Sequence, residues 1–171
     1  LVIDGNYKTL VGTGLSTSIT AANANVDILQ IGNGTDIRQW NSVRDIMFQG
    51  GQGILLNNIS QTDLARVRMS GSNSHGFRFE GGCWVVNFLQ CEVYSASGDG
   101  IHMVSSPALE QNNGINFTQC RAWSCLNGAG AHIDGAATVN FHGCNLEGNV
   151  VGLYIACTNR NTQAISMTGG C

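Results

Sequence analysis

The sequence has few of the residues that interrupt strand pairing and few of those that bind polyanions. It holds one proline and one lysine, Lys8, and only 11% of its 171 residues are charged. Proline cannot donate a hydrogen bond within a sheet, so its scarcity is compatible with extensive strand pairing. A formal net charge of −3 without a basic cluster argues against nucleic acid or an anionic membrane as the partner. No run of 18 or more apolar residues is present, so we expect no membrane span.

What the chain does contain is an internal repeat. Residues 86–93 return as residues 115–122 and again as residues 139–146. Extended in both directions, the repeat has an apolar residue at one position in six copies, with steps of 21, 24, 29, 24 and 26 residues. These residues are Val43, Leu64, Phe88, Phe117, Phe141 and Met167. A second repeat is a glycine followed by apolar residues at alternate positions, beginning at Gly53, Gly76, Gly100, Gly130 and Gly152.

The length of these repeats predicts the fold class. Irregular repeats of short alternating strands, without helical periodicity, are typical of a stacked solenoid. Leucine-rich repeats have a similar period, but their Leu and Asn scaffold is missing here, so the pattern favours a parallel β-helix. We therefore predict an all-β chain with coils of 21–30 residues that forms a single domain over residues 1–171. Equivalent side chains then stack into ladders about 4.8 Å apart along the axis.

The seven cysteines follow the coils rather than a disulfide pattern. Their number is odd, and Cys91, Cys120 and Cys144 share one inward position, where a thiol is a small apolar filler. Stacked parallel side chains seldom reach the torsion that a disulfide needs, so we expect buried free thiols. Free thiols are easier to maintain in a protein that folds in a reducing cytoplasm.

Three segments carry a resemblance to a known family: residues 3–6, residues 43–50, and the glycine-led strands such as residues 100–103. They resemble the pectate-lyase-like right-handed β-helix superfamily, most closely the tailspikes and tail-associated depolymerases of bacteriophages, over the whole chain. The resemblance implies right-handed coils, a homotrimer, and the binding and cleavage of a bacterial surface polysaccharide. It carries over no catalytic residue, because the paired-Asp and Gly-His-Gly strings of polygalacturonases and the Asp cluster of pectate lyases are missing.

The outward positions of the glycine-led strands form the richest cluster of titratable groups, along which an extended polysaccharide could lie. The cluster comprises Arg78, Glu80, His102, His132, Asp134 and Tyr154. We predict that Glu80, Asp134 and His132 are catalytic and that Arg78, His102 and Tyr154 bind substrate. Glu80 and Asp134, two coils or about 10 Å apart, would serve an inverting hydrolase. A lyase would instead rely on His132 and Tyr154, with Arg78 neutralising a uronate. The alternative is a solvated or subunit-facing polar surface.

Other outward residues give further expectations. Tyr94 and Trp123, one coil apart on the first repeat, are additional substrate-binding candidates, since exposed aromatics stack on sugar rings or on another chain. Asparagines recur at one outward position and should form an amide column. The insertion at residues 105–113, which contains Pro107, should form a loop beside His102. We predict no metal ligand set and no cofactor.

These patterns leave three functions open. The first is a phage tailspike, located in the virion tail after folding in the host bacterial cytoplasm, that binds and cleaves a bacterial surface polysaccharide. The second is a secreted bacterial polysaccharide lyase or hydrolase, and the third is a non-enzymatic virion adhesin or structural appendage. Because the chain begins and ends within the repeat pattern and no polar cap is evident, we expect it to be a segment of a longer protein.

Overall fold

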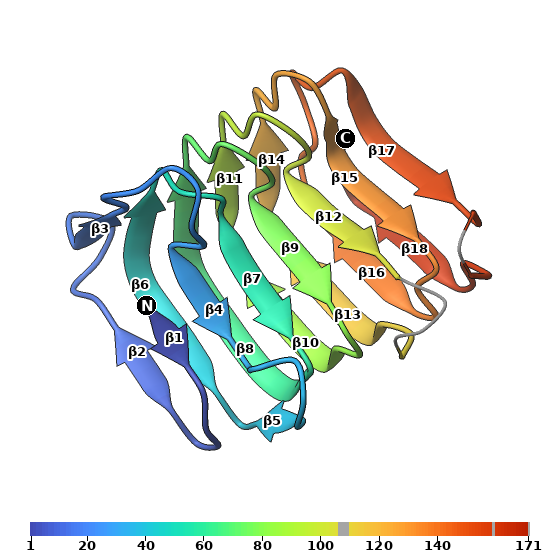
Figure 1. The fold of residues 1–171 in the computed structure, drawn as a ribbon. Helices are drawn as coiled ribbons and strands as arrows, with labels where there is room; N and C mark the ends of the chain where they lie inside the picture. Colours follow the sequence, from blue (N-terminus) through green and yellow to red (C-terminus); the bar gives the residue numbers. More distant parts are fainter. Residues whose placement is uncertain (106–109, 159, 171) are drawn as a thin grey trace.

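The computed structural model describes residues 1–105, 110–158 and 160–170, and in these residues the named elements are all β-strands. They form two sheets that face each other along the axis of the solenoid (Figure 1). Paired strands run parallel, as β9 (Phe77–Glu80) and β12 (Ile101–Val104) do. The first sheet has seven strands, one for each coil. They are β1 (Val2–Ile3), β4 (Leu29–Ile31), β7 (Ile54–Asn57), β9 (Phe77–Glu80), β12 (Ile101–Val104), β15 (Ala129–Asp134) and β17 (Val151–Ala156).

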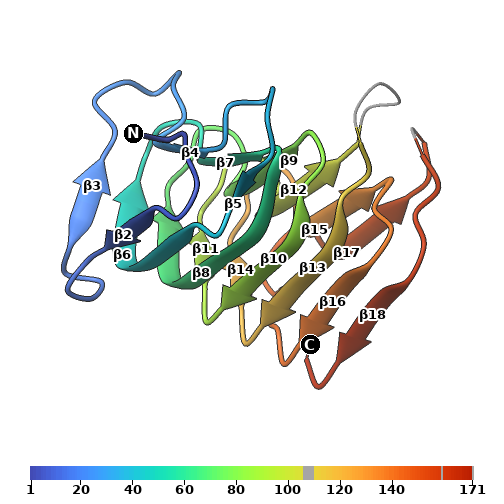
Figure 2. The ribbon, with the colours of Figure 1, turned by 90° about the horizontal axis from the view of Figure 1, so that it is seen from below.

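The second sheet has eleven strands, because several coils contribute two to it. Figure 2 shows β10, β13, β16 and β18 side by side in this sheet. Its strands are β2 (Thr9–Val11), β3 (Ser18–Thr20), β5 (Arg38–Gln39), β6 (Ser42–Gln49), β8 (Ile59–Ser70), β10 (Trp84–Leu89), β11 (Glu92–Tyr94), β13 (Asn113–Thr118), β14 (Arg121–Trp123), β16 (Val139–His142) and β18 (Ile165–Thr168). The predicted all-β parallel solenoid is therefore confirmed.

The strand register confirms the predicted ladders. Phe117 pairs with Phe88 on one side and with Phe141 on the other, as the repeat requires. In the first sheet, Phe77 pairs with Ile54 and Ile101. A slip of one residue would exchange the two faces of every strand, so this agreement fixes which side chains point outward.

The core between the sheets is a continuous apolar column. Phe117 is 1% exposed, and its ring stacks on that of Phe88 at 4.6 Å and on that of Phe141 at 5.0 Å between centroids. The six described cysteines are all free, and five of them are buried. The thiols of Cys120 and Cys144 each donate a hydrogen bond to a backbone carbonyl of the preceding coil, at 3.5 and 3.3 Å. Buried free thiols, as predicted, thus belong to the core.

The second sheet bends at a column of residues with left-handed backbone. In successive coils this position is held by Asp45, Arg66, Gln90, Gln119, Gly143 and Gly169, with φ between 52° and 60°. A residue with a side chain pays about 1–2 kcal/mol for this conformation, so contacts along the column must offset the cost. Arg66 Nε bonds Asp45 Oδ1 at 2.6 Å, and Gln90 Nε2 bonds Gln119 Oε1 at 3.0 Å. The bend recurs at the same place in each coil and directs the chain around the core.

Candidate functional site

The outward column of the first sheet lies as the sequence predicted. Strand register places His102 opposite Arg78 and opposite His132, and His132 opposite Tyr154. The two histidines are partly buried, whereas Tyr154 is exposed. Each residue comes from a different strand, β9, β12, β15 or β17, so four successive coils build this surface.

The expected pair of exposed carboxylates is not formed, because Asp134 is buried at 3% exposure. Its Oδ1 accepts a hydrogen bond from the Thr158 amide at 2.9 Å. Asp134 stays in register with Val104 and Ala156, as the repeat requires, but its carboxylate is covered at the end of β15, where the segment that contains Thr158 contacts it. The prediction that Asp134 lies exposed beside Glu80 was therefore wrong, and a hydrolytic pair of these two residues has no support in this arrangement.

Arg78 is held by carboxylates on both sides. Its guanidinium lies 3.1 Å from Asp27 and 3.0 Å from the exposed Glu80. The positive charge is therefore already compensated, and a substrate carboxylate would have to displace one of these partners. Arg78 and Glu80 lie on the predicted face, but they form an ion pair with each other.

Asp99, which the sequence analysis missed, organises the histidines. It lies in the turn before β12, and its buried carboxylate uses both oxygens. Oδ1 accepts a hydrogen bond from the Ala129 amide at 2.7 Å. Oδ2 lies 2.7 Å from Nδ1 of His102 and 3.3 Å from Nδ1 of His132. Because both imidazoles turn Nδ1 toward the acid, the nitrogen left for chemistry on each ring is Nε2.

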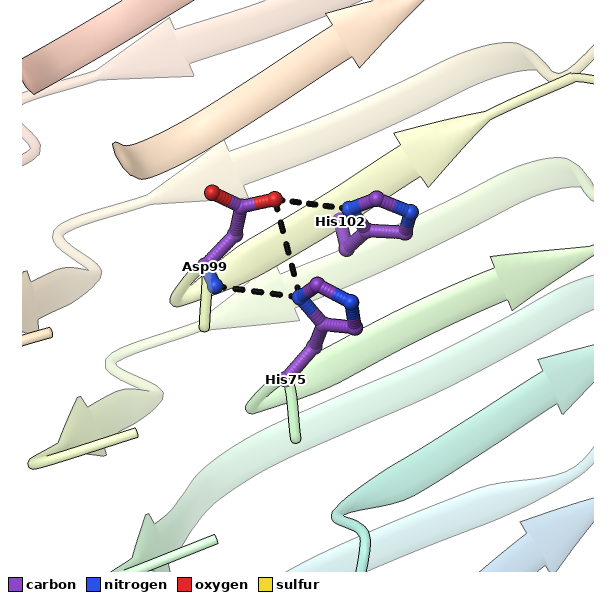
Figure 3. Close-up of side chains that lie close together, drawn as sticks. All are labelled: His75, Asp99 and His102. Atoms are coloured by element: carbon purple, nitrogen blue, oxygen red, sulfur yellow. Dashed lines mark hydrogen bonds and ion pairs between the residues drawn. The ribbon is translucent and has the colours of Figure 1, made fainter. Parts of the chain in front are cut away.

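A third histidine, His75, completes this cluster from the preceding coil (Figure 3). Its ring stacks on that of His102 with centroids 3.8 Å apart and planes 17° apart. Its Nδ1 accepts a hydrogen bond from the Asp99 amide at 3.0 Å and lies 3.5 Å from Asp99 Oδ2. The group that we call the Asp99 cluster therefore consists of His75, Asp99, His102 and His132.

The surroundings lower the pKa values of two members, which favours the neutral form of His75 and the charged form of Asp99. Burial, reinforced by the neighbouring His102, lowers the pKa of His75 to about 4, so this imidazole is neutral at neutral pH. Burial also acts to raise the pKa of the Asp99 carboxyl, but hydrogen bonds with His102 and the Ala129 amide outweigh it and lower the pKa to about 2. Asp99 is therefore a fixed negative charge among imidazoles.

Glycines give this cluster its space. A Cβ on Gly98 would lie 2.9 Å from His75 Nδ1, and a Cβ on Gly128 would lie 2.6 Å from both the backbone nitrogen and Oδ1 of Asp99. The signal that could have revealed His75 and Asp99 is their position, since each immediately precedes a repeated glycine, Gly76 or Gly100. Residues at this position in adjacent coils stack just as strand residues do.

An open cleft of about 280 Å³ adjoins the cluster. Its lining residues are Asp99, Asn127, Gly128, Ala129, His132, Val150, Val151 and Tyr154. The rings of His132 and Tyr154 lie 4.8 Å apart between centroids at an angle of 59°. This volume is near the lower limit of about 300 Å³ for small-molecule sites. Because the cleft is open, it could hold one residue of an extended polymer that continues beyond it.

The other predicted binding residues, Tyr94 and Trp123, belong to the second sheet and are not part of this cleft. Their rings contact each other at 4.3 Å between centroids, as the register of β11 and β14 requires. Trp123 Nε1 donates to Glu92 at 2.6 Å, and Glu92 also pairs with Arg68 at 3.1 Å. These contacts describe a surface polar network, and the structure does not bring it together with His132.

Two further expectations concern the asparagine column of the second sheet and the predicted insertion. The asparagine column is present, with Asn116 Nδ2 bonding Asn87 Oδ1 at 3.0 Å and Asn140 Nδ2 bonding Asn116 Oδ1 at 2.8 Å. Residues 106–109 of the predicted insertion, including Pro107, lie outside the described residues, whereas Ser105 is buried and Glu110 is exposed.

The stacked parallel coils, with a histidine-rich cleft on the outer face of one sheet, define the class of protein as a parallel β-solenoid. A family model for the right-handed β-helix region matches residues 52–165, and the chain belongs to this family. Comparisons with curated proteins and with solved structures found no match. Within the described residues, no helix is long and apolar enough to cross a membrane.

Proposed function

We propose that this protein binds a bacterial surface polysaccharide across the outer face of the first sheet and cleaves it at the cleft beside the Asp99 cluster. The observation that carries the proposal is that one carboxylate, Asp99, holds His132 through Nδ1 while His132 and Tyr154 line the same cleft. A right-handed β-helix is compatible with proteins that bind or depolymerise polysaccharides, and its parallel strands offer equivalent positions at each coil to an extended ligand.

The geometry favours β-elimination over hydrolysis. Hydrolysis by inversion needs two accessible carboxyl groups, and Asp134 is buried. Elimination needs a base for the proton on the carbon next to a uronate carboxylate and an acid for the leaving oxygen. His132 Nε2 takes the proton, the carbon–oxygen bond at the glycosidic link breaks as a carbon–carbon double bond forms, and the Tyr154 hydroxyl protonates the departing oxygen. The products are a saturated end and an unsaturated uronate end.

The setting that we propose is a bacteriophage tailspike in the virion tail, assembled as a homotrimer in the host cytoplasm. The resemblance of the coils to tailspikes supports it, and so do the buried free thiols, which a reducing compartment maintains. Light scattering of the purified chain measures the trimer directly, and a monomer in solution would contradict that part of the proposal.

The test of the activity is incubation with a panel of purified capsules and O-antigens, with the products analysed by mass spectrometry. Unsaturated ends are expected. Saturated ends would show a hydrolase instead, and binding without products would show an adhesin. His132→Ala and Tyr154→Phe should each lower the rate by about 10²–10⁴. The matched control is His142→Ala, because His142 bonds Thr168 on the second sheet at 2.9 Å and lies in a different sheet from the cleft. If His132→Ala and Tyr154→Phe cleave as fast as the His142→Ala control, this assignment is refuted.

A further inference from the structure

Three of the four histidines in the chain gather around Asp99, although they come from three different coils. His75 lies before β9, His102 within β12 and His132 within β15. One atom from each of His75, Asp99 and His102 lies within 4.8 Å of the other two. Figure 3 shows these three side chains converging from neighbouring coils. Imidazole nitrogen and a single carboxylate are the donor set that divalent transition metals prefer.

The hydrogen bonds of the cluster leave one contact unexplained. His75 Nδ1 accepts the Asp99 amide, so this nitrogen presents a lone pair rather than a proton. The same nitrogen lies 3.5 Å from Asp99 Oδ2, which is also an acceptor. The two acceptor atoms repel each other, and a cation bound to both would remove this repulsion once it had displaced the Asp99 amide from the single lone pair of Nδ1.

We propose that Asp99 Oδ2, together with one nitrogen each from His75 and His102, binds a divalent transition-metal ion such as Zn²⁺. Ligands at about 2.0–2.2 Å around a tetrahedral ion are separated from one another by about 3.3–3.6 Å. The 3.5 Å distance between His75 Nδ1 and Asp99 Oδ2 already has this value. The 2.7 Å hydrogen bond between His102 and Asp99 must open by about 0.6–0.9 Å to reach it.

Loading requires a rotation of at least one ring. A nitrogen lone pair lies in the plane of its imidazole, so two rings stacked at 17° cannot both point at one ion. The side chains of His75 and His102 are 24% and 23% exposed, which leaves room to turn about the Cβ–Cγ bond. The proton on His102 Nδ1 passes to solvent or reappears on Nε2 as the metal replaces it.

The surrounding groups suit a metal ligand. Ala129 holds Asp99 Oδ1 at 2.7 Å, so the carboxylate offers Oδ2 as a single donor in a fixed orientation. His132 contacts this same oxygen at 3.3 Å. Hydrogen bonds of this kind to the remaining atoms of a ligand orient it and tune the bound ion. Two nitrogens and one oxygen favour Zn²⁺, Co²⁺ or Ni²⁺ over Ca²⁺ or Mg²⁺, which prefer oxygen ligands.

The ion would also supply a charge that the cleft lacks. Arg78 is neutralised by Asp27 and Glu80, whereas Asp99 and His132 line the cleft itself. A divalent ion on Asp99 would therefore be the positive charge nearest to a uronate carboxylate beside His132. This role rests on the proposed function, but binding of the metal does not.

The test is a titration of the full metal-free chain with Zn²⁺ in competition with a chromogenic chelator, after exposed thiols have been blocked with iodoacetamide. One equivalent should bind, and Co²⁺ should give a visible absorption band typical of nitrogen and oxygen ligands. Asp99→Asn, His75→Gln and His102→Gln should each weaken Zn²⁺ binding by at least about tenfold. His142→Gln is the matched control and should bind like the parent, with circular dichroism verifying the fold of each variant.

The outcomes separate the two proposals. Absence of stoichiometric Zn²⁺ and Co²⁺ binding to the parent chain would overturn this inference, whatever the variants do. So would an equal loss of affinity in the His142→Gln control. One equivalent bound by a protein that cleaves no polysaccharide would support the metal site and leave only the proposed function refuted.

Discussion

Replacing Phe117 by alanine tests the register on which every outward assignment depends. The side chain is 1% exposed and stacked between two other phenylalanines, so the substitution removes apolar contacts and leaves a cavity that the rigid coils cannot fill. Truncation of a buried phenylalanine costs about 3–5 kcal/mol. Each aromatic pair adds about 0.5–1.5 kcal/mol beyond burial, so the loss should fall in the upper part of that range.

The matched control is Asn116→Ala, one residue earlier in β13. Asn116 points outward, and its amide bonds Asn87 and Asn140 at the surface. Each of these two hydrogen bonds contributes about 0.5–1.5 kcal/mol net, so the control should lose at most about 3 kcal/mol, less than Phe117→Ala. Guanidinium unfolding followed by circular dichroism measures both, with the slope m compared to detect fraying of single coils. A loss for Asn116→Ala as large as that for Phe117→Ala would reverse the inward and outward faces.

Three further predictions concern the thiols and the glycines. In the native protein, Cys157 should react at once with a thiol reagent, whereas the five buried cysteines should react only after denaturation. Prompt reaction of those five would contradict their burial. Burial raises the pKa of Cys83 from 9.0 to about 12, so its contribution to stability is complete below pH 9 and is lost as the pH rises toward 12, by about 1.4 kcal/mol per pH unit. Alkaline unfolding of Cys83→Ala should accordingly show a shallower dependence on pH than that of the parent, and identical slopes would refute the attribution. Gly128→Ala should displace Asp99 and reduce polysaccharide cleavage at least about tenfold. Gly5→Ala is the control and should cleave at the parental rate, because the atoms nearest to its Cβ would belong to the long side chain of Lys8.

The repeated strands could be predicted from the sequence because their side chains alternate with a period of two. Phe88, Phe117 and the column of His102, His132 and Tyr154 lie in the middle of strands, where pairing with both neighbours fixes the direction of each side chain. The parallel coils and the buried thiols followed from the same pattern, whereas the right-handed β-helix family followed from the resemblance of these strands to that family.

The failures lie where alternation ends. Asp134 closes β15 in the register that the repeat predicts, but its carboxylate is buried against the segment that contains Thr158. His75 and Asp99 lie in the turns before strands, where no two-residue period applies. Their side chains meet only because adjacent coils stack their turns as well as their strands, which depends on the three-dimensional course of the chain.

Histidines from three consecutive coils share the Asp99 carboxylate, so the cluster forms only where at least three coils are stacked. A coil in a solenoid contacts mainly the coils before and after it, and the Asp99 cluster uses one such neighbour on each side. Insertions or losses of whole coils elsewhere in the stack therefore leave the cluster unchanged, whereas a slip of one coil within it dismantles the cluster completely. The Asp99 cluster therefore depends on the stacking of three coils and not on the total length of the solenoid.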